Sequence, residues 1–323
     1  MVIAVDYSLS ASTLLRESTK RAHESVENTQ GAVWLASGKL PKEEYVRFLV
    51  MLWHIYDALE RGLQAHASDP LVSSVWTPLA PVVSRADTIA ADIVHLLHLD
   101  ETSAQTRSWL SHPTVSALLS SPPPGFTEYI NRINRYSDPD SSSSSSFSAP
   151  RALAHAYVRY LGDLSGGQII RQRITKAYAL DRADGRGIAF YRFGTLESPD
   201  AVAGPSDLRR IKEQFRRRLD ESVGGDQKVK AVLIEEANLA FRLNEGLFSA
   251  LQGPTAEDQD APKVVYDNTK APSSSAPLVS VSTVISFIMA ASLAHFILVV
   301  TGFTGTAGSV KYKAFEDWLF GGV

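Results

Sequence analysis

YVRYLGDLSGGQIIRQRITKAY, residues 157–178, combines the periodicity of a helix with residues that weaken one. Side chains typical of a buried or ligand-facing side recur at helical spacing: Tyr157, Tyr160, Leu161, Leu164 and Gln168. Gly162, Gly166 and Gly167 interrupt them, and each costs a helix about 1 kcal/mol relative to alanine. Because glycine has no Cβ, such a run lets a flat ligand approach the backbone and lets the helix bend. One glycine would favour close helix packing; three beside Asp163 favour a ligand-facing helix.

A second candidate segment, STLLRESTKRAHESVEN at residues 12–28, has the pattern of an amphipathic helix. His23 lies on the seam between its apolar face and a charged face that carries Arg16, Lys20 and Glu27. A neutral imidazole there could bind iron, the two cations could meet carboxylates, and Glu27 could orient the other ring nitrogen. An ordinary packed or half-exposed histidine is the alternative, and the spacing alone leaves both interpretations open.

These two segments resemble the heme oxygenase family. The glycine-rich stretch is similar to the family's kinked distal helix, whose backbone lies over the heme face and whose aspartate holds the water network that protonates bound dioxygen. The matching positions are Gly162, Asp163, Gly166 and Gly167. The string LLRESTKRAHESVEN is similar to the family's proximal helix, and the resemblance places the axial iron ligand at His23, with Glu27 behind it.

The resemblance also implies roles for residues outside those motifs. It places Tyr56, from WHIYDALE, in the hydrogen-bond network of Asp163, although helical periodicity alone makes Tyr56 a core residue. Arg159 and Tyr157 precede the aspartate, and the spacing of Arg159 permits an ion pair that would help keep Asp163 ionised. The cations that would meet the heme propionates are Arg16, Lys20, Lys212 and Arg216.

The wider pattern predicts an all-α fold: a multi-helical single domain over residues 12–252. Further helices are indicated at residues 43–63, 126–136, 207–221 and 228–251. Residues 1–11 are expected to be disordered. The serine-rich insertion at residues 137–150 cannot bury apolar surface, so a mobile loop is expected there.

The C-terminal part predicts a membrane anchor. A linker at residues 253–277 precedes 26 residues without a formal charge, 278–303, long enough to cross about 30 Å of hydrocarbon. With no signal sequence at the N-terminus, this transmembrane helix is expected to be a tail anchor in the endoplasmic reticulum membrane, with the mitochondrial outer membrane as the alternative. The catalytic domain would face the cytosol. Residues 304–323 would follow as a C-terminal tail.

Composition excludes several chemistries. The chain of 323 residues contains no cysteine, so disulfides, thiolate heme ligands and cysteine nucleophiles are excluded. A net charge of −3 without basic runs gives no indication of nucleic-acid binding. His95 and His98 are spaced as a metal-binding pair, but no EXXH repeat accompanies them, which favours a packed or solvated pair.

The resemblance therefore implies an enzyme that uses dioxygen to cleave heme, at once substrate and cofactor, to biliverdin, carbon monoxide and ferrous iron. The electrons would come from an NADPH-dependent flavoprotein reductase. Two alternatives are a carrier or sensor that binds heme without cleaving it, and a tail-anchored helical adaptor that binds none. Asp163 argues against the carrier, which has no need of a distal carboxylate.

Overall fold

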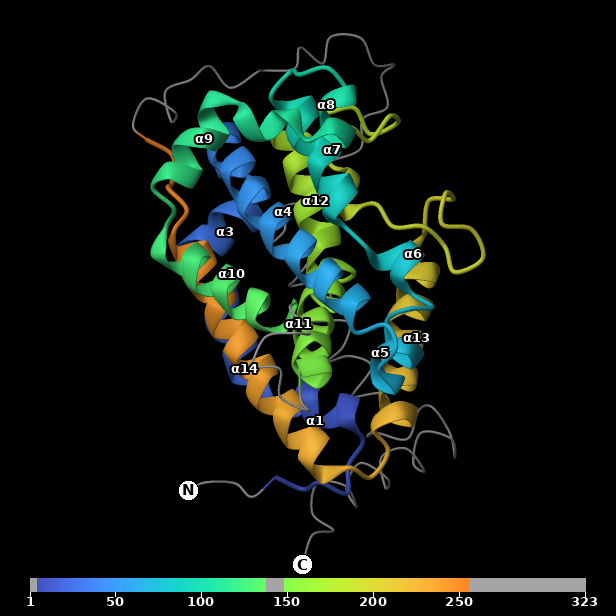
Figure 1. Ribbon diagram of the computed structural model, residues 1–323. Helices are drawn as coiled ribbons and strands as arrows, with labels where there is room; N and C mark the ends of the chain where they lie inside the picture. The colour runs from blue at the N-terminus through green and yellow to red at the C-terminus, as the bar shows by residue number, and fades with distance from the viewer. Residues whose placement is uncertain (1–4, 138–147, 256–323) are drawn as a thin grey trace, which may run out of the picture. The chain divides into compact units, whose positions relative to one another are not determined.

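The computed structural model describes residues 5–137 and 148–255, and within them every regular element is a helix (Figure 1). The α-helices are α1 (Ala11–Ser18), α2 (Lys20–Glu27), α3 (Gln30–Ser37), α4 (Lys42–Ala65), α5 (Pro70–Val75), α6 (Ala80–Val83), α7 (Ala86–Leu96), α8 (Thr102–Thr106), α9 (Pro113–Ser120), α10 (Pro124–Ser137), α11 (Ser148–Asp163), α12 (Gly166–Ala177), α13 (Pro205–Val223) and α14 (Gln227–Ser249). Two short 3-10 helices are η1 (Ser108–Ser111) and η2 (Ala189–Tyr191). The predicted all-α class is confirmed for these residues.

Helix α4 forms much of the core. It packs against α7, α10 and α11, so that neighbours cover more than one of its faces (Figure 1). The apolar side chains that recur at helical spacing along it are buried: Tyr45, Phe48, Leu49, Leu52, Tyr56 and Leu59. Helix α14 packs against α10, α11, α2 and α1, which brings the N-terminal helices onto the same framework as the glycine-rich stretch.

The glycine-rich stretch is two helices rather than one bent helix. Helix α11 ends at Asp163, and α12 begins at Gly166. Ser165 between them has φ −116° and ψ −87°, values outside the helical region. The predicted bend is therefore a complete break in the helix, placed directly after the aspartate. The segment at residues 12–28 likewise divides into α1 and α2 at Thr19.

The N-terminal segment differs from the expectation of disorder through residue 11. The ammonium group of Lys230 donates hydrogen bonds to the carbonyls of Tyr7 (3.0 Å) and Leu9 (2.8 Å). Asp220 then accepts from both the amide and the hydroxyl of Ser12, each at 2.7 Å. These bonds, from α13 and α14, hold the segment that leads into α1.

Two predicted segments lie wholly or largely outside the described residues. They are residues 138–147 of the serine-rich insertion and the C-terminal part beyond residue 255, including the predicted span at residues 278–303. The ends of the predicted loop at residues 137–150 are helical instead: Ser137 is the last residue of α10, and residues 148–150 begin α11. In the described ranges, no helix has both the length and the apolar character needed to cross a membrane.

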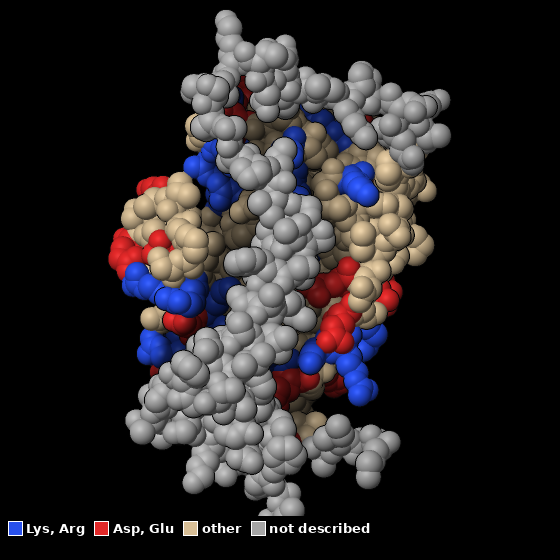
Figure 2. All heavy atoms as spheres, turned by 180° about the vertical axis from the view of Figure 1, so that it is seen from behind, with Lys and Arg blue, Asp and Glu red and all other residues tan. Residues whose placement is uncertain are grey.

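On the face seen from behind, the Lys and Arg side chains of the described residues are interspersed with Asp and Glu (Figure 2).

Candidate active site

A cavity of about 290 Å³ brings together the two segments that sequence analysis singled out. Helix α2 supplies His23 and Glu27, while α11 and α12 supply Arg159, Asp163 and the glycines. The remaining walls are mostly apolar and include Leu35, Phe48, Leu52, Val158, Phe190, Phe241 and Phe248. An apolar cavity with a few convergent polar groups is the usual form of a ligand or cofactor site.

His23 lies at the wall of this cavity contributed by α2. Its side chain is 51% exposed, and its Nδ1 is 3.4 Å from a carboxylate oxygen of Glu27, one turn later on the same helix. Its ring and that of Phe241 pack in a T-shaped arrangement, with ring centroids 5.4 Å apart. A carboxylate at Nδ1 favours the tautomer with its proton there, which leaves Nε2 free to act as a ligand.

The glycines divide into two groups by what surrounds them. A Cβ added at Gly162 or Gly166 would meet no atom within 4 Å, so both positions face open space in the cavity. A Cβ at Gly167 would lie 3.0 Å from a ring carbon of Tyr191, so that glycine serves close packing. Two bare backbone positions and an imidazole on one apolar cavity are the groups that a heme would need, and the residues present fit it.

Asp163, the last residue of α11, is part of a buried polar network. The hydroxyl of Tyr56 donates to one carboxylate oxygen of Asp163, and Nη2 of Arg159 lies 3.6 Å from the other. Arg159 also donates from Nε to the Tyr56 hydroxyl (3.1 Å) and from Nη1 to the side-chain oxygen of Asn244 (2.6 Å). The predicted pairing of Arg159 with Asp163 is present, and Tyr56 is both a core residue and a network member.

The pKa of Asp163 is set by opposing effects of burial and of its polar partners. Burial raises the pKa of Asp163, and the opposing effects of the Arg159 charge and the Tyr56 hydrogen bond offset this only in part. The charge of Arg159 therefore lowers the pKa of Asp163, as the spacing indicated, but burial raises it by more, and the net shift is upward. A carboxyl group with a raised pKa is better suited to exchanging a proton.

Sequence analysis missed two members of the network. Asn244, from α14, donates to the Tyr129 hydroxyl (3.3 Å) and to the Ala240 carbonyl (2.7 Å), while its oxygen accepts from Arg159. The signal was available: Asn244 is a polar residue four positions after Ala240 and three before Leu247, on the apolar side of its helix. Tyr129 falls in the helix predicted at residues 126–136, where the sequence assigned its hydroxyl no polar role.

The predicted cationic residues lie on α1, α2 and α13. The Lys212 ammonium group donates to the Ser165 hydroxyl (3.0 Å) at the break between α11 and α12. Tyr157 is buried, which raises its pKa, while Arg216 and Arg16 lower it through a hydrogen bond and their charges. Arg216 and Arg16 are therefore neighbours of Tyr157, and Lys20 is exposed on α2.

No other metal centre is indicated within the described ranges, because no group of three or more His, Asp or Glu side chains converges there. His95 and His98 both line a different cavity, considered below, without the further ligands a metal would need.

Comparison with known proteins gives one consistent family. The model of the family described as "Heme oxygenase" matches residues 9–113 and 120–250. Heme oxygenase 1 of Nostoc sp. is 30% identical over 241 residues, which are 74% of this chain and 84% of that protein. Heme oxygenase 1 of Gallus gallus is 29% identical over 250 residues, which are 77% of this chain and 72% of that protein.

A solved structure supports the same assignment. The crystal structure of heme oxygenase-2 from Synechocystis sp., in complex with heme and NO, has a TM-score of 0.58 and 28% identity, covering 74% of this chain and 84% of that one. With a family model that matches most of the chain, and with the cavity, glycines and imidazole in place, the chain belongs to the heme oxygenase family of enzymes.

Proposed function

We propose that this enzyme cleaves heme oxidatively to biliverdin, carbon monoxide and ferrous iron. Dioxygen would be the oxidant, and an NADPH-dependent flavoprotein reductase would supply the electrons. The observation that carries the proposal is the cavity that joins His23 with the bare backbone of Gly162 and Gly166 and the carboxyl group of Asp163. When bound, the heme itself supplies the iron that activates dioxygen and the porphyrin that is cleaved.

His23 would hold the iron through Nε2, while Glu27 keeps the proton on Nδ1 and fixes the plane of the ring. Phe241 packs against the His23 ring in a T-shaped arrangement. Changing His23 to alanine is expected to abolish the absorption spectrum of a histidine-bound heme. An unchanged spectrum would remove the assignment of His23 as the ligand.

Gly162 and Gly166 would form a surface without side chains against which the flat porphyrin lies. Asp163 sits between them in sequence, so its carboxyl group is held close to that surface while Tyr56 and Arg159 fix its orientation. A carboxyl group in this place would hold water in the cavity and pass protons to it, which is the role of a general acid.

The charged edge of the porphyrin would meet Arg16, Lys20, Lys212 and Arg216. Two observations support this role. Arg16 and Arg216 both lie near Tyr157, and Lys212 bonds Ser165 at the helix break, next to Gly166. Burial and the nearby Arg216 lower the pKa of Lys212. An anionic group at this edge would relieve the repulsion between these cations.

We also propose that residues 278–303 anchor the enzyme in the endoplasmic reticulum membrane, or in the mitochondrial outer membrane, with the catalytic domain in the cytosol. The 26-residue uncharged stretch supports the anchor. Fluorescently tagged full-length chain should lie on membranes, and deletion of residues 278–303 should release it. An unchanged distribution after deletion would contradict the anchor.

A carrier that binds heme without cleaving it is the alternative to be tested. Purified protein incubated with heme, dioxygen and a reductant should convert the heme absorption bands to the spectrum of biliverdin, with product identity checked by chromatography. Stoichiometric binding without conversion would identify a carrier. Failure to bind heme at all would favour the adaptor that sequence analysis left open.

A further inference from the structure

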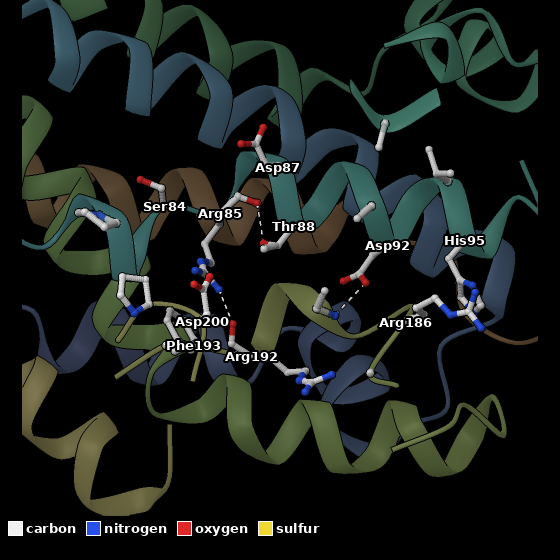
Figure 3. Close-up of a pocket in the computed structure, with 18 of the residues that line it drawn as sticks. Ser84, Arg85, Asp87, Thr88, Asp92, His95, Arg186, Arg192, Phe193 and Asp200 are labelled. Atoms are coloured by element: carbon white, nitrogen blue, oxygen red, sulfur yellow. Dashed lines mark hydrogen bonds between the residues drawn. The ribbon is translucent and has the colours of Figure 1, made fainter. Parts of the chain in front are cut away.

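Two cavities of this domain share a wall formed by residues 189–192, here called the wall segment. Phe190 and Tyr191 line the cavity described above, whereas Ala189 and Arg192 line a wider one of about 1290 Å³ beside α7 (Figure 3). The position of the wall segment therefore sets part of the shape of the active-site cavity.

From the side of α7, buried side chains fix the backbone of the wall segment. The carboxylate of Asp92, which is fully buried, accepts from the amides of Ala189 and Phe190, each at 2.8 Å. The guanidinium group of Arg85, 4% exposed, donates to the carbonyls of Phe190 (3.3 Å) and Arg192 (2.7 Å). Figure 3 shows Arg85 and Asp92 reaching from the α7 side toward this segment. Four hydrogen bonds of this kind make the wall segment a rigid reference point.

From the other side, the first turn of α12 is attached to the same segment by one side chain. The amide nitrogen of Gln168 donates to the Tyr191 carbonyl (3.0 Å) and to the Asp163 carbonyl (3.3 Å). The neighbouring Gly167 lets the ring of Tyr191 approach so closely that a Cβ would be 3.0 Å from it. Gln168 thus connects the end of α11 and the start of α12 to each other and to the wall segment.

The carbonyl of Asp163 needs such a partner. A helix leaves its last carbonyls without intrahelical donors, and Asp163 is the last residue of α11. Without the bridge, the backbone of Asp163 would be fixed only by its own helix, next to the non-helical Ser165. With it, the aspartate is connected through Tyr191 to Arg85 and Asp92.

We propose that Gln168 is a positioning residue for Asp163: its amide ties the aspartate backbone to the wall segment and so fixes where the carboxyl group stands over the glycine-lined cavity. The inference rests on the proposed heme cleavage for its effect on the reaction. It acts through Asp163 and does not require contact between Gln168 and the heme.

The test compares Gln168→Met with Gln172→Met in the full chain. Methionine keeps the length and helix propensity of glutamine but removes the amide, and Gln172 is an exposed glutamine one turn later. Amide hydrogen exchange of the heme-free proteins is the first measurement. Exchange over residues 162–168 is expected to be about tenfold faster in Gln168→Met, since a bond to a buried carbonyl is lost. Gln172→Met should match the unaltered protein.

Single turnover with bound heme is the second measurement. Gln168→Met is expected to form biliverdin about tenfold more slowly with heme affinity unchanged, because the carboxyl group and not the binding surface has moved. Gln168→Asn keeps the amide on a shorter side chain, so both measurements should fall between those of Met and the unaltered protein. This second variant also serves should the Met variant fail to fold.

The outcomes separate the two proposals. If the unaltered protein forms biliverdin and Gln168→Met does so at the same rate, the positioning role is overturned and the proposed function stands. Equal amide exchange rates in Gln168→Met and Gln172→Met would show that the Gln168 hydrogen bonds do not hold the Asp163 backbone in place. If the unaltered protein binds heme but forms no biliverdin, the proposed function is overturned, and with it any role of Gln168 in that reaction.

Discussion

Two buried carboxyl groups, Asp163 of α11 and Glu236 of α14, are held in opposite ways. Glu236 accepts from Arg132 twice (2.9 and 2.5 Å), from the Tyr136 hydroxyl (3.1 Å) and lies 2.9 Å from Nε2 of His155. Burial raises the pKa of Glu236, but the hydrogen bonds from His155 and Arg132 outweigh it and bring the pKa to about 2. This carboxylate is saturated with donors and holds α10, α11 and α14 together.

Asp163 has fewer donors and one side open to the cavity. Its partners are the Tyr56 hydroxyl and, at 3.6 Å, the Arg159 guanidinium group, and they do not cancel the effect of burial, so its pKa is raised. The difference teaches that burial alone does not decide what a carboxyl group does. A carboxylate with a donor for every oxygen holds helices together, whereas a carboxyl group with few donors beside a cavity can take up and release protons.

The sharpest test of this contrast, with the largest expected effect, is Asp163→Ala. Heme should still bind, because His23 and the glycines are untouched, but biliverdin formation should fall by about 100-fold or more, as loss of a general acid does. The heme should instead support peroxidase-like oxidation of added donors. The measurement is the absorption spectrum of single-turnover products, with Asp200→Ala, at an exposed carboxylate, as control. Full biliverdin yield would show that protons are managed elsewhere.

Glu236→Gln should have the opposite signature. It leaves Arg132 and His155 without their carboxylate and is expected to lower the free energy of unfolding by roughly 2 kcal/mol. The rate of biliverdin formation per folded molecule should stay the same. Urea unfolding checks the first point, and Glu235→Gln, at the exposed neighbour, is the matched control. Equal stability of the two variants would contradict the structural role.

Asn244→Leu should give a smaller effect on the reaction. The substitution removes the oxygen that accepts from Arg159, so the guanidinium group is oriented less well toward Asp163, and turnover is expected to slow about tenfold. Asn238→Leu on the same helix, where the side chain only bonds the Ile234 carbonyl, is the control. Equal turnover rates in the Asn244→Leu and Asn238→Leu variants would contradict the role of Asn244 in orienting Arg159.

The smallest expected effect is on the pH dependence of stability. Burial lowers the pKa of His155 below its usual value of 6.5, and the hydrogen bonds to Glu236 lower the pKa of that carboxyl group from 4.5 to about 2. The unfolded chain therefore binds more protons than the folded one at these two groups, so stability falls as pH drops below 6.5 and again between 4.5 and about 2. Asp163 acts in the opposite sense, because its pKa is raised and the folded state takes up its proton first.

Urea midpoints of the heme-free protein measured across this pH range would check the sign. Glu236→Gln should remove the part of the decline below pH 4.5, while Asp163→Ala should leave it in place. A decline of the same size in Glu236→Gln would mean that other carboxylates cause it.

The long helices could be predicted from the sequence because apolar residues that recur at helical spacing mark the buried face of a helix. Helix α4, expected at residues 43–63, runs from Lys42 to Ala65, and α14, expected at residues 228–251, runs from Gln227 to Ser249. Gly162 and Gly166 were read as ligand-facing, and both face open space. These properties depend on residue type and local spacing, which a single sequence contains.

Other properties depend on partners far apart in the chain. The raised pKa of Asp163 reflects burial by several helices, which outweighs the lowering by Arg159 that the local spacing predicted. Asn244 and Gln168 act through bonds to residues 85 and 23 positions away, which periodicity does not reveal. The break at Ser165 likewise arises where neighbours satisfy the freed backbone groups, and the sequence indicated only a bend.

The bonds from Lys230 and Asp220 to the segment before α1 have a practical meaning for anyone shortening the protein. Removing the first eleven residues as dispensable would leave the Lys230 ammonium group without the two carbonyls it binds, although that side chain is buried. A truncation that starts at residue 7 retains both hydrogen bonds from Lys230. One that starts at residue 12 loses them, and the segment that leads to the helices before His23 is then held less firmly.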